Sequence, residues 1–463
     1  MPPSGKNSIF CCLSKADPIM VYTNKVLAFI METAWETLPR AVQHQAKRCL
    51  LDSMGAMIAG HGTPVGQLMA RLAAAQFSGD QAAIVVSGRR VSAAGAALAN
   101  GFAANALDID DGYRKIKGHP GVCVLPAILA AVQLTSKDGC MVSGKQFLTT
   151  LAVGYEVGIR AGLIRHATCD TYHSSGSWGA VAGAAAAGRV LGLSREQLGH
   201  AIGAADYHAP MAPMMKCIAT PCMGKDSTGW GSLVGIVSAL MAREGFTGIA
   251  PLFDDTPEPE WINSLGSDWE IENLYFKPHA CCRWAQPGVD GTLKLVRDHG
   301  ILPDDIEKIT VYTFAESAAL CREWPEDTEQ AQYNIAFPIA AALLDGQVGP
   351  AQVLPPRLLD DDIRTMMHKI DIIAHERFQK QFPDRAESEV EIRTRSGHIR
   401  RSGVMSARWD PATTFPADRE LTDKFLWLAG PVLGERKTGR LCDSIFHLET
   451  QKNLDQFFRL CVK

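Results

Sequence analysis

Three aspartates and one histidine lie in a short polar stretch whose side chains suit acid–base chemistry. Asp108, Asp110 and Asp111 are followed by His119, which sits in a Gly-His-Pro-Gly unit. Imidazole exchanges protons near neutral pH, and carboxylates accept them. The proline stiffens the backbone beside the imidazole. Acids at helix ends are also common without any catalytic role, but the whole assembly favours a functional site.

The elements on either side must hold this stretch in the interior. Ser92 is a good N-cap for an alanine-rich helix over 93–107, and a second apolar helix is expected over 122–134. A polar loop between two core helices is costly to desolvate without partners. We therefore expect the loop to be kept for function.

Histidine and lysine candidates follow in two later loops. His173 precedes a glycine-rich turn and a small-residue helix. Lys216 and Lys225 lie in a loop rich in Met, Gly and Pro, between Pro210 and Gly231. The alternative for either lysine is a solvated side chain that extends out of an apolar wall.

Two cations share a further short loop, Lys277-Pro-His-Ala-Cys281-Cys282-Arg283. Lysine and arginine this close together favour a carboxylate-binding site. The two cysteines are expected to be buried and inert.

These motifs, taken in order, resemble the MmgE/PrpD family over roughly residues 20–460. That family includes 2-methylcitrate dehydratases, cis-aconitate decarboxylases and an iminodisuccinate epimerase. The resemblance implies catalytic roles for Asp108, His119, His173, Lys216 and Tyr333, and substrate-binding roles for Lys225, Lys277, Arg283 and Gln286. Tyr333 matches a family tyrosine at the domain interface. Gln286 stands where many relatives have histidine, and glutamine cannot exchange protons.

Composition limits the other possibilities. The 463 residues are 46% hydrophobic and 21% charged with net charge −4, which gives no reason to expect nucleic acid or a membrane surface as a partner. No apolar run is long enough to predict a membrane span. The 13 cysteines include no C-x-x-C pair, so we expect reduced thiols, no metal and an intracellular protein. A cytoplasmic location is predicted, with a mitochondrial one as the alternative.

The pattern of periodicities predicts a mainly α protein with two domains. A large helical domain is expected from both ends of the chain, 21–265 and 406–463, with a smaller α+β lid domain over 266–405. The lid should contain a strand near 306–314 and a hairpin over 389–395 and 398–404. Residues 1–20 are expected to lack fixed structure. The resemblance also implies a homodimer.

Histidine, lysine and arginine in one cleft suit a small polycarboxylate substrate. We predict cofactor-free dehydration of a 2-alkylcitrate or 2-methylcitrate by proton abstraction and loss of hydroxide. Decarboxylation of cis-aconitate, or epimerisation of an iminodisuccinate-like substrate, is the alternative, and a non-catalytic binding protein is a third. The segments 207–210 and 225–231 resemble the dehydratases and the epimerase more than the decarboxylases.

Overall fold

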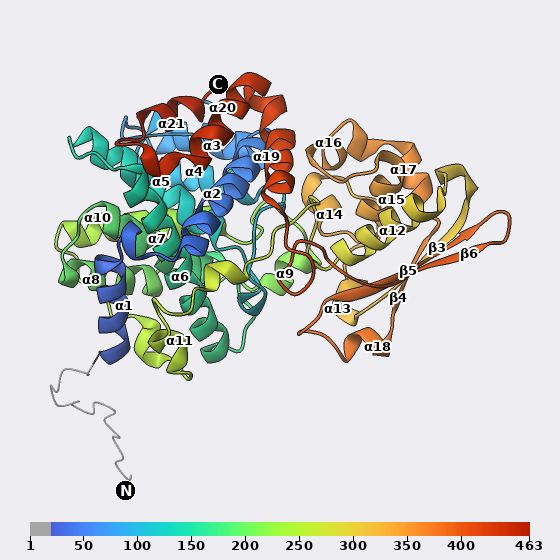
Figure 1. Ribbon diagram of the computed structural model, residues 1–463, viewed down its shortest axis with the longest axis horizontal. Coiled ribbons are helices and arrows are strands. Elements are labelled where there is room, and N and C mark those ends of the chain that lie inside the picture. The colour runs from blue at the N-terminus through green and yellow to red at the C-terminus, as the bar shows by residue number, and fades with distance from the viewer. Residues whose placement is uncertain (1–19) are drawn as a thin grey trace, which may run out of the picture.

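The chain is mainly α-helical, as predicted, and the computed structural model describes residues 20–463. The prediction for residues 1–20 lies, apart from Met20, outside the described residues. The helices before residue 265 are α1 Val21–Glu32, α2 Arg40–Gly60, α3 Pro64–Gln76, α4 Ala93–Asn105, α5 Gly121–Lys137, α6 Gly144–Thr168, α7 Gly176–Val190, α8 Arg195–Tyr207, α9 Met214–Ala219, α10 Thr228–Arg243 and α11 Glu260–Asn263. They gather on one side of the molecule (Figure 1).

A four-stranded sheet marks the other side of the molecule (Figure 1). Its strands are β3 Ile306–Thr313, β4 Ile370–Ala374, β5 Glu387–Thr394 and β6 Ile399–Ser406, in the order β4-β3-β5-β6. β4 is parallel to β3, and the other neighbours are antiparallel. The accompanying helices are α12 Gln286–His299, α13 Ala315–Ala318, α14 Thr328–Gln332, α15 Ala336–Asp345, α16 Pro350–Val353, α17 Asp361–Met367 and α18 Glu376–Gln379.

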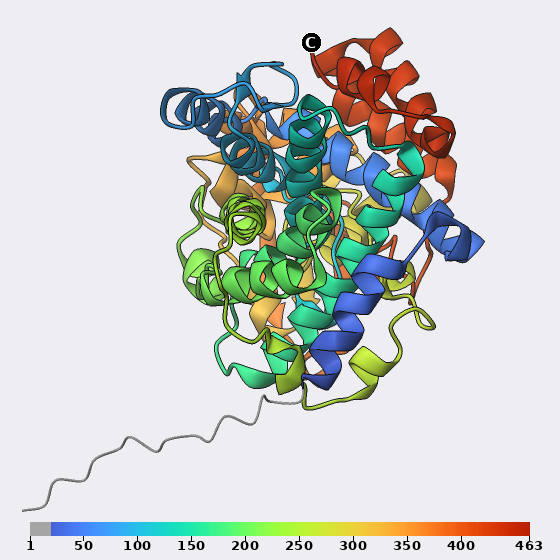
Figure 2. The same ribbon diagram turned by 90° about the vertical axis from the view of Figure 1, so that its left-hand side faces the viewer.

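The C-terminal part of the chain returns to the helical side. It forms α19 Asp418–Leu433, α20 Glu435–Phe446 and α21 Asp455–Leu460. α19 packs along α2, and α20 contacts α2 as well. In Figure 2 these red helices lie beside the blue α2. The two ends of the chain therefore share one core.

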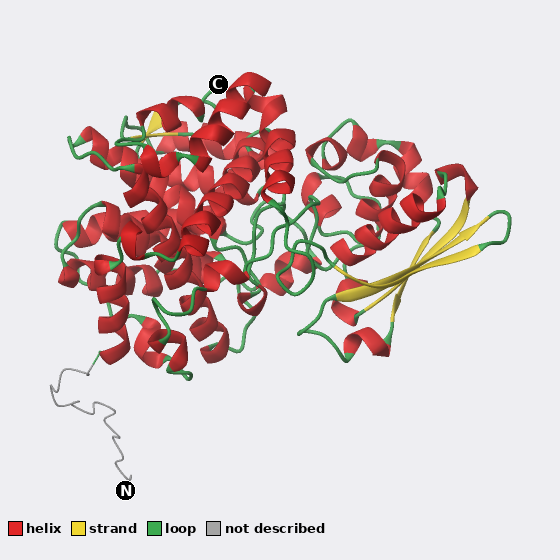
Figure 3. Cartoon of the chain, viewed as in Figure 1, coloured by secondary structure: helices red, strands yellow, loops and turns green. Residues whose placement is uncertain are grey.

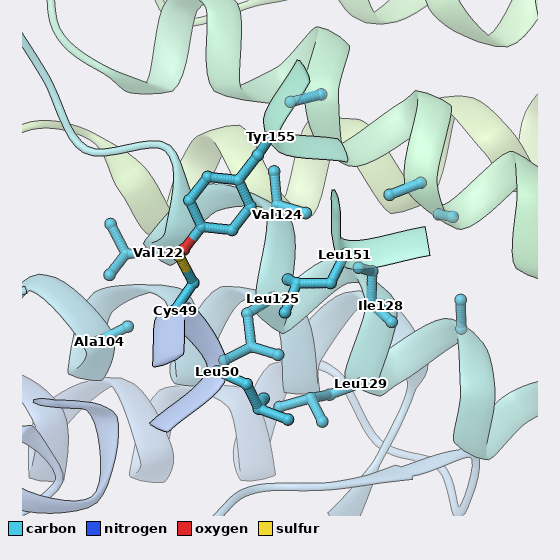
Figure 4. Close-up of a cluster of buried hydrophobic side chains, with 14 of the residues drawn as sticks. Cys49, Leu50, Ala104, Val122, Val124, Leu125, Ile128, Leu129, Leu151 and Tyr155 are labelled. Atoms are coloured by element: carbon cyan, nitrogen blue, oxygen red, sulfur yellow. The ribbon is translucent and has the colours of Figure 1, made fainter. Parts of the chain in front are cut away.

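Caps and small residues build the helices that carry the polar stretch. The Ser92 hydroxyl accepts a hydrogen bond from Gly95 N at 3.1 Å and begins α4, as predicted. α7 and α10 approach closely at Gly183 and Gly235 because glycine has no Cβ. A Cβ added at Gly235 would lie only 2.8 Å from the backbone of Gly183. Figure 4 shows the apolar cluster where α2, α4, α5 and α6 meet. These contacts form a rigid base for the loop that follows α4.

The buried apolar side chains fall into two clusters. The larger contains side chains of α1–α8, α10 and α19–α21, and it includes Trp269, Ile271, Leu274 and Phe276. The smaller contains α12, α15 and the sheet, together with a few side chains of the helical part such as Ile109. Loops gather where the two parts meet (Figure 3).

One helix, α6, is long and apolar enough to cross a membrane by length and composition alone. The whole of that apolar stretch is buried inside the protein. Its side chains belong to the larger cluster and pack against α2, α5 and α7.

Several elements were not predicted from the sequence, α3 among them. The loop between Pro210 and Gly231 contains the short helix α9, and α17 ends at Met367. The chain then forms β4, an edge strand in which only Ile372 is buried. An edge strand with one buried side chain has no clear alternation, so only its pairing with β3 defines it.

Candidate active site

A cavity of about 450 Å³ lies between the helical part and the sheet part. Its polar and aromatic lining comprises Asp108, Arg114, Lys117, His119, Tyr172, Asp226, Tyr275, Lys277, Arg283, Trp284, Tyr333, Phe382, Asp384, Arg385, Ser406, Asp410 and Thr413. The predicted residues Asp108, His119, Lys277, Arg283 and Tyr333 are therefore brought together. They come from loops or element ends, as is usual for residues that act on ligands.

His119 is held between two aspartates at the base of the cavity. Its Nδ1 lies 2.8 Å from Asp110 Oδ2 and 2.8 Å from the carbonyl oxygen of Asp111. Its Nε2 lies 3.5 Å from Asp108 Oδ1. Burial lowers the pKa of His119, but the Asp110 carboxylate outweighs this effect and raises the pKa to about 9. The imidazole is therefore protonated at neutral pH.

Lys277 reaches the same aspartate from a distant part of the chain. Its Nζ lies 2.8 Å from Asp108 Oδ1. The backbones of Gly112 and Tyr275 form an antiparallel bridge with hydrogen bonds of 3.0 and 2.9 Å. Burial lowers the pKa of Lys277, and Asp108 and Asp110 together raise it above its ordinary value. The lysine thus stays charged although its side chain is buried.

Arg283 lines the cavity beside Lys277 but has its own partner. Its Nη2 lies 2.6 Å from Asp410 Oδ2, and its guanidinium lies 4.2 Å from the centre of the Tyr275 ring. Asp410 belongs to the segment between β6 and α19. The arginine is consequently fixed by a carboxylate and an aromatic face.

Tyr333 lines the cavity and directly follows α14. Its hydroxyl donates to Asp226 Oδ2 over 3.4 Å, and Asp226 Oδ1 accepts from the Ser175 hydroxyl at 2.9 Å. Ser175 Oγ in turn accepts from the backbone N–H of His119 at 3.1 Å. Burial raises the pKa of Tyr333 above its ordinary value, so the phenol stays protonated. These bonds connect Tyr333 to the loop that carries His119.

Four predicted site residues do not line this cavity. His173 is buried, its Nδ1 lies 2.6 Å from the Ser177 hydroxyl, and its ring stacks on His166 at 4.4 Å. Lys216 is exposed on α9, whose cavity-lining residues are Met214 and Ile218. The sequence could not show which face of this short helix turns inward.

Lys225 and Gln286 are buried behind the lining and act as structural bridges. Lys225 Nζ donates to Asn105 O at 2.7 Å and to Gln332 Oε1 at 2.6 Å. Gln286 Nε2 donates to the carbonyl oxygens of His279 and Cys281 at 2.9 and 3.1 Å. Their predicted contact with substrate is therefore replaced by contacts that fix the neighbouring loops.

Further charged side chains, outside the cavity lining, contact the loop of residues 108–111. Lys424 of α19 places its Nζ 2.5 Å from Asp52 Oδ1 and 2.6 Å from the carbonyl oxygen of Ile109. Asp111 accepts from the Tyr155 hydroxyl and from Gly121 N. Burial and the nearby Asp52 raise the pKa of Asp111 to about 7. α19 thus anchors the peptide between the two aspartates that contact His119.

Several lining residues were missed from the sequence. Asp226 faces the cavity, whereas the preceding Lys225 does not, and the structural signal is the positive φ of Lys225 and Ser227. Arg114 and Lys117 lie inside the polar motif itself, between the aspartates and His119. Their position in the motif was the only sequence signal available.

Asp108, Asp110 and His119 each offer a ligand atom within 4.8 Å of the others, a spacing that could hold a metal ion. Lys277 Nζ already neutralises Asp108, and Asp110 is already paired with His119. These ion pairs compete with a cation, so the donor set fits a metal poorly. The predicted independence of metal stays a prediction.

Buried, mutually paired acids and cations with shifted pKa values that line a cavity are typical of an enzyme active site. Residues 25–271 match the MmgE/PrpD N-terminal domain, and residues 279–448 match the MmgE/PrpD C-terminal domain. The chain therefore belongs to the MmgE/PrpD family.

Relatives of known name match between 72% and 95% of the chain. The cis-aconitate decarboxylase-like protein oryM of Aspergillus oryzae is 27% identical over 95% of this chain and 96% of its own. The cis-aconitate decarboxylase of Aspergillus terreus is 23% identical over 95% of each chain. The human cis-aconitate decarboxylase is 25% identical over 72% of each chain.

Proposed function

We propose that this lyase-type member of the MmgE/PrpD family removes water from a small polycarboxylate of the 2-alkylcitrate or 2-methylcitrate type. One observation carries the proposal: a protonated imidazole and a carboxylate lie side by side in the cavity. His119 Nε2 is 3.5 Å from Asp108 Oδ1, and the pKa of His119 is raised to about 9 by Asp110 despite its burial. Elimination needs both a proton acceptor and a proton donor.

The proton balance of such a step uses both groups. Asp108 accepts the proton from a carbon next to a substrate carboxylate, and the electron pair forms the carbon–carbon double bond. The neighbouring carbon–oxygen bond breaks, and His119 donates its Nε2 proton to the departing oxygen, which leaves as water. Lys277, 2.8 Å from Asp108, offsets the negative charge that develops on the substrate.

Decarboxylation of cis-aconitate or a similar substrate is the second candidate, and the names of the relatives favour it. In that reaction a carbon–carbon bond breaks, CO₂ leaves, and the electron pair stays on the substrate. His119 would then protonate the carbon, so the same donor serves both reactions. Epimerisation of an iminodisuccinate-like substrate is the third possibility.

The arrangement of the chain supports a lid. We propose that residues 266–405 form a smaller domain that closes over the helical domain of 21–265 and 406–463, with the two hydrophobic clusters as their cores. The inclusion of Trp269–Phe276 in the larger cluster favours a boundary near residue 277. A homodimer without metal, in the cytoplasm, is proposed on the family resemblance and the composition.

One experiment separates these reactions. The purified protein is incubated with 2-methylcitrate, citrate, cis-aconitate and iminodisuccinate, and the products are followed by NMR together with CO₂ release. Loss of water from a citrate without CO₂ supports the proposal, and CO₂ release from cis-aconitate supports the second candidate. Turnover of none of the four contradicts both.

A further inference from the structure

The cations at the base of the cavity are already neutralised. Lys277 is paired with Asp108 at 2.8 Å, and Arg283 is paired with Asp410 at 2.6 Å. A polycarboxylate that enters the cavity must compete with these aspartates for each cation. Binding of every substrate carboxylate at the base would therefore be weak, because the ion pairs it replaces are preformed and buried.

Two other cations stand at the rim of the cavity without such partners. Arg114 and Lys117 both line the cavity and both are exposed. Among residues 20–463, neither has a carboxylate within ion-pair distance; Arg114 Nη1 donates only to the backbone carbonyl of Asp384 at 3.1 Å. Lys117 Nζ lies 5.2 Å from the centre of the Tyr172 ring. These charges are free to meet an incoming anion.

The backbone at Lys117 is held in a conformation that lysine rarely adopts. Its φ is 49° and its ψ is 38°, in the left-handed region. This conformation is strained for a residue with a side chain and persists only where its surroundings fix it. Left-handed non-glycine residues occur often at functional sites, where the strain aims a side chain.

Three hydrogen bonds fix this turn. The Tyr172 hydroxyl donates to the carbonyl oxygen of Lys117 at 3.0 Å, and His166 Nε2 lies 2.7 Å from the carbonyl oxygen of Ile116. Tyr113 N donates to Gly118 O at 2.9 Å and closes the turn. Burial and neighbouring charge lower the pKa of His166 to about 4, so the ring is neutral and can donate. The turn is thus built to hold Lys117 at the rim.

We propose that Lys117, with Arg114 beside it, binds a carboxylate of the substrate at the mouth of the cavity. This inference rests on the proposed polycarboxylate substrate. In this proposal, the rim residues bind a substrate carboxylate that is remote from the reacting carbon. The residues at the base of the cavity transfer the protons. This contact also favours a tricarboxylate over a dicarboxylate, because the tricarboxylate has a further carboxylate to place at the rim.

The test is a binding measurement that does not need turnover. Isothermal titration calorimetry with tricarballylate, which carries three carboxylates and no hydroxyl to eliminate, is applied to the wild type and to Lys117→Asn. Asparagine tolerates left-handed φ, so the turn is kept while the charge is removed. Lys115→Asn is the matched control, since Lys115 is exposed on the same turn but does not line the cavity.

We expect Lys117→Asn to weaken tricarballylate binding about 5- to 10-fold, as the loss of one partly exposed charge-assisted contact should. The double variant Arg114→Gln/Lys117→Asn should weaken it further, and Lys115→Asn should leave it unchanged. Glutarate, a dicarboxylate, should lose less affinity than tricarballylate in the Lys117→Asn protein.

One outcome would contradict the role of the rim, and another would contradict the polycarboxylate substrate class. If the wild type binds tricarballylate and both Lys117→Asn and the double variant bind it equally well, the role of the rim is wrong and the proposed function is untouched. If the wild type binds neither tricarballylate nor glutarate, the polycarboxylate substrate class itself is wrong, and the role of the rim falls with it.

Discussion

Cations line both the base and the rim of the cavity, but those at the base are buried and paired, whereas Arg114 and Lys117 at the rim are exposed. At the base, Asp108, His119 and Lys277 are buried and paired with one another at 2.8 to 3.5 Å. At the rim, Arg114 and Lys117 are exposed and have no carboxylate partner among the described residues. Burial with fixed partners shifts proton affinities and preorganises a reaction. An exposed side chain without a carboxylate partner can bind an anionic ligand, and its charge costs the folded protein little stability.

The comparison predicts its largest effect for His119→Asn. Removal of a positioned acid–base group lowers rates by roughly 10²- to 10⁴-fold, so kcat should fall by that amount. The measurement is steady-state kinetics on whichever substrate the NMR assay identifies. A melting temperature near that of the wild type would show that the fold is kept. Near-normal turnover would exclude His119 as the proton donor.

Lys277→Met should show how much the base depends on pairing. It removes the closer of the two cationic groups beside the buried Asp108 and leaves only His119 at 3.5 Å; loss of one partner of a buried ion pair costs roughly 3–5 kcal/mol in proteins. Unfolding in urea should therefore reveal a large loss of stability together with weakened activity. The control is Lys294→Met, since Lys294 forms an exposed i,i+4 pair with Asp298 that is worth less than about 1 kcal/mol. Equal losses in both variants would contradict the distinction between buried and exposed pairs.

The pH dependence tests the charge of His119. Its pKa, raised by Asp110 to about 9 against the effect of burial, lies above the ordinary value near 6.5. Its ion pair therefore contributes stability fully below about pH 6.5, and this contribution is lost as the pH rises through about 9. If His119 is the proton donor, kcat/KM should also fall above pH 9. Melting temperatures and rates between pH 6 and 10 measure both effects, and a fall centred near pH 6.5 would contradict the assignment.

The smallest effect is expected for Lys216→Ala. Lys216 is exposed on α9 and lies outside the cavity lining. Its removal should change kcat and KM by less than about twofold, because surface substitutions usually alter free energies by no more than about 0.5 kcal/mol. A large loss of activity would mean that α9 moves, or that a second copy of the chain brings Lys216 to a site.

Local signals in the sequence predicted most of the elements. Ser92 begins α4 as an N-cap, β3 forms at the predicted strand, and β5 and β6 form at the predicted hairpin. Such signals involve neighbouring residues only, so they can be found without the fold. β4 was missed because its definition depends on pairing with β3, 61 residues away between Ile309 and Ile370.

The sequence by itself determined the chemical composition of the site and the helices around it. The aspartates, His119 and the Lys277–Arg283 loop were identifiable from residue type and spacing. Only the tertiary structure decided how these groups are used. Asp110, rather than Asp108, makes the closer contact with His119, and Asp226 faces the cavity in place of Lys225.

The physical reason is that a side chain's direction depends on backbone angles and distant neighbours. Lys225 has a φ of 38° and turns its ammonium toward Asn105 and Gln332, which leaves the following Asp226 at the cavity. The charge state of His119 follows from burial and from a 2.8 Å contact that folding creates. Residue types set which reactions are possible, and the fold sets which group performs each step.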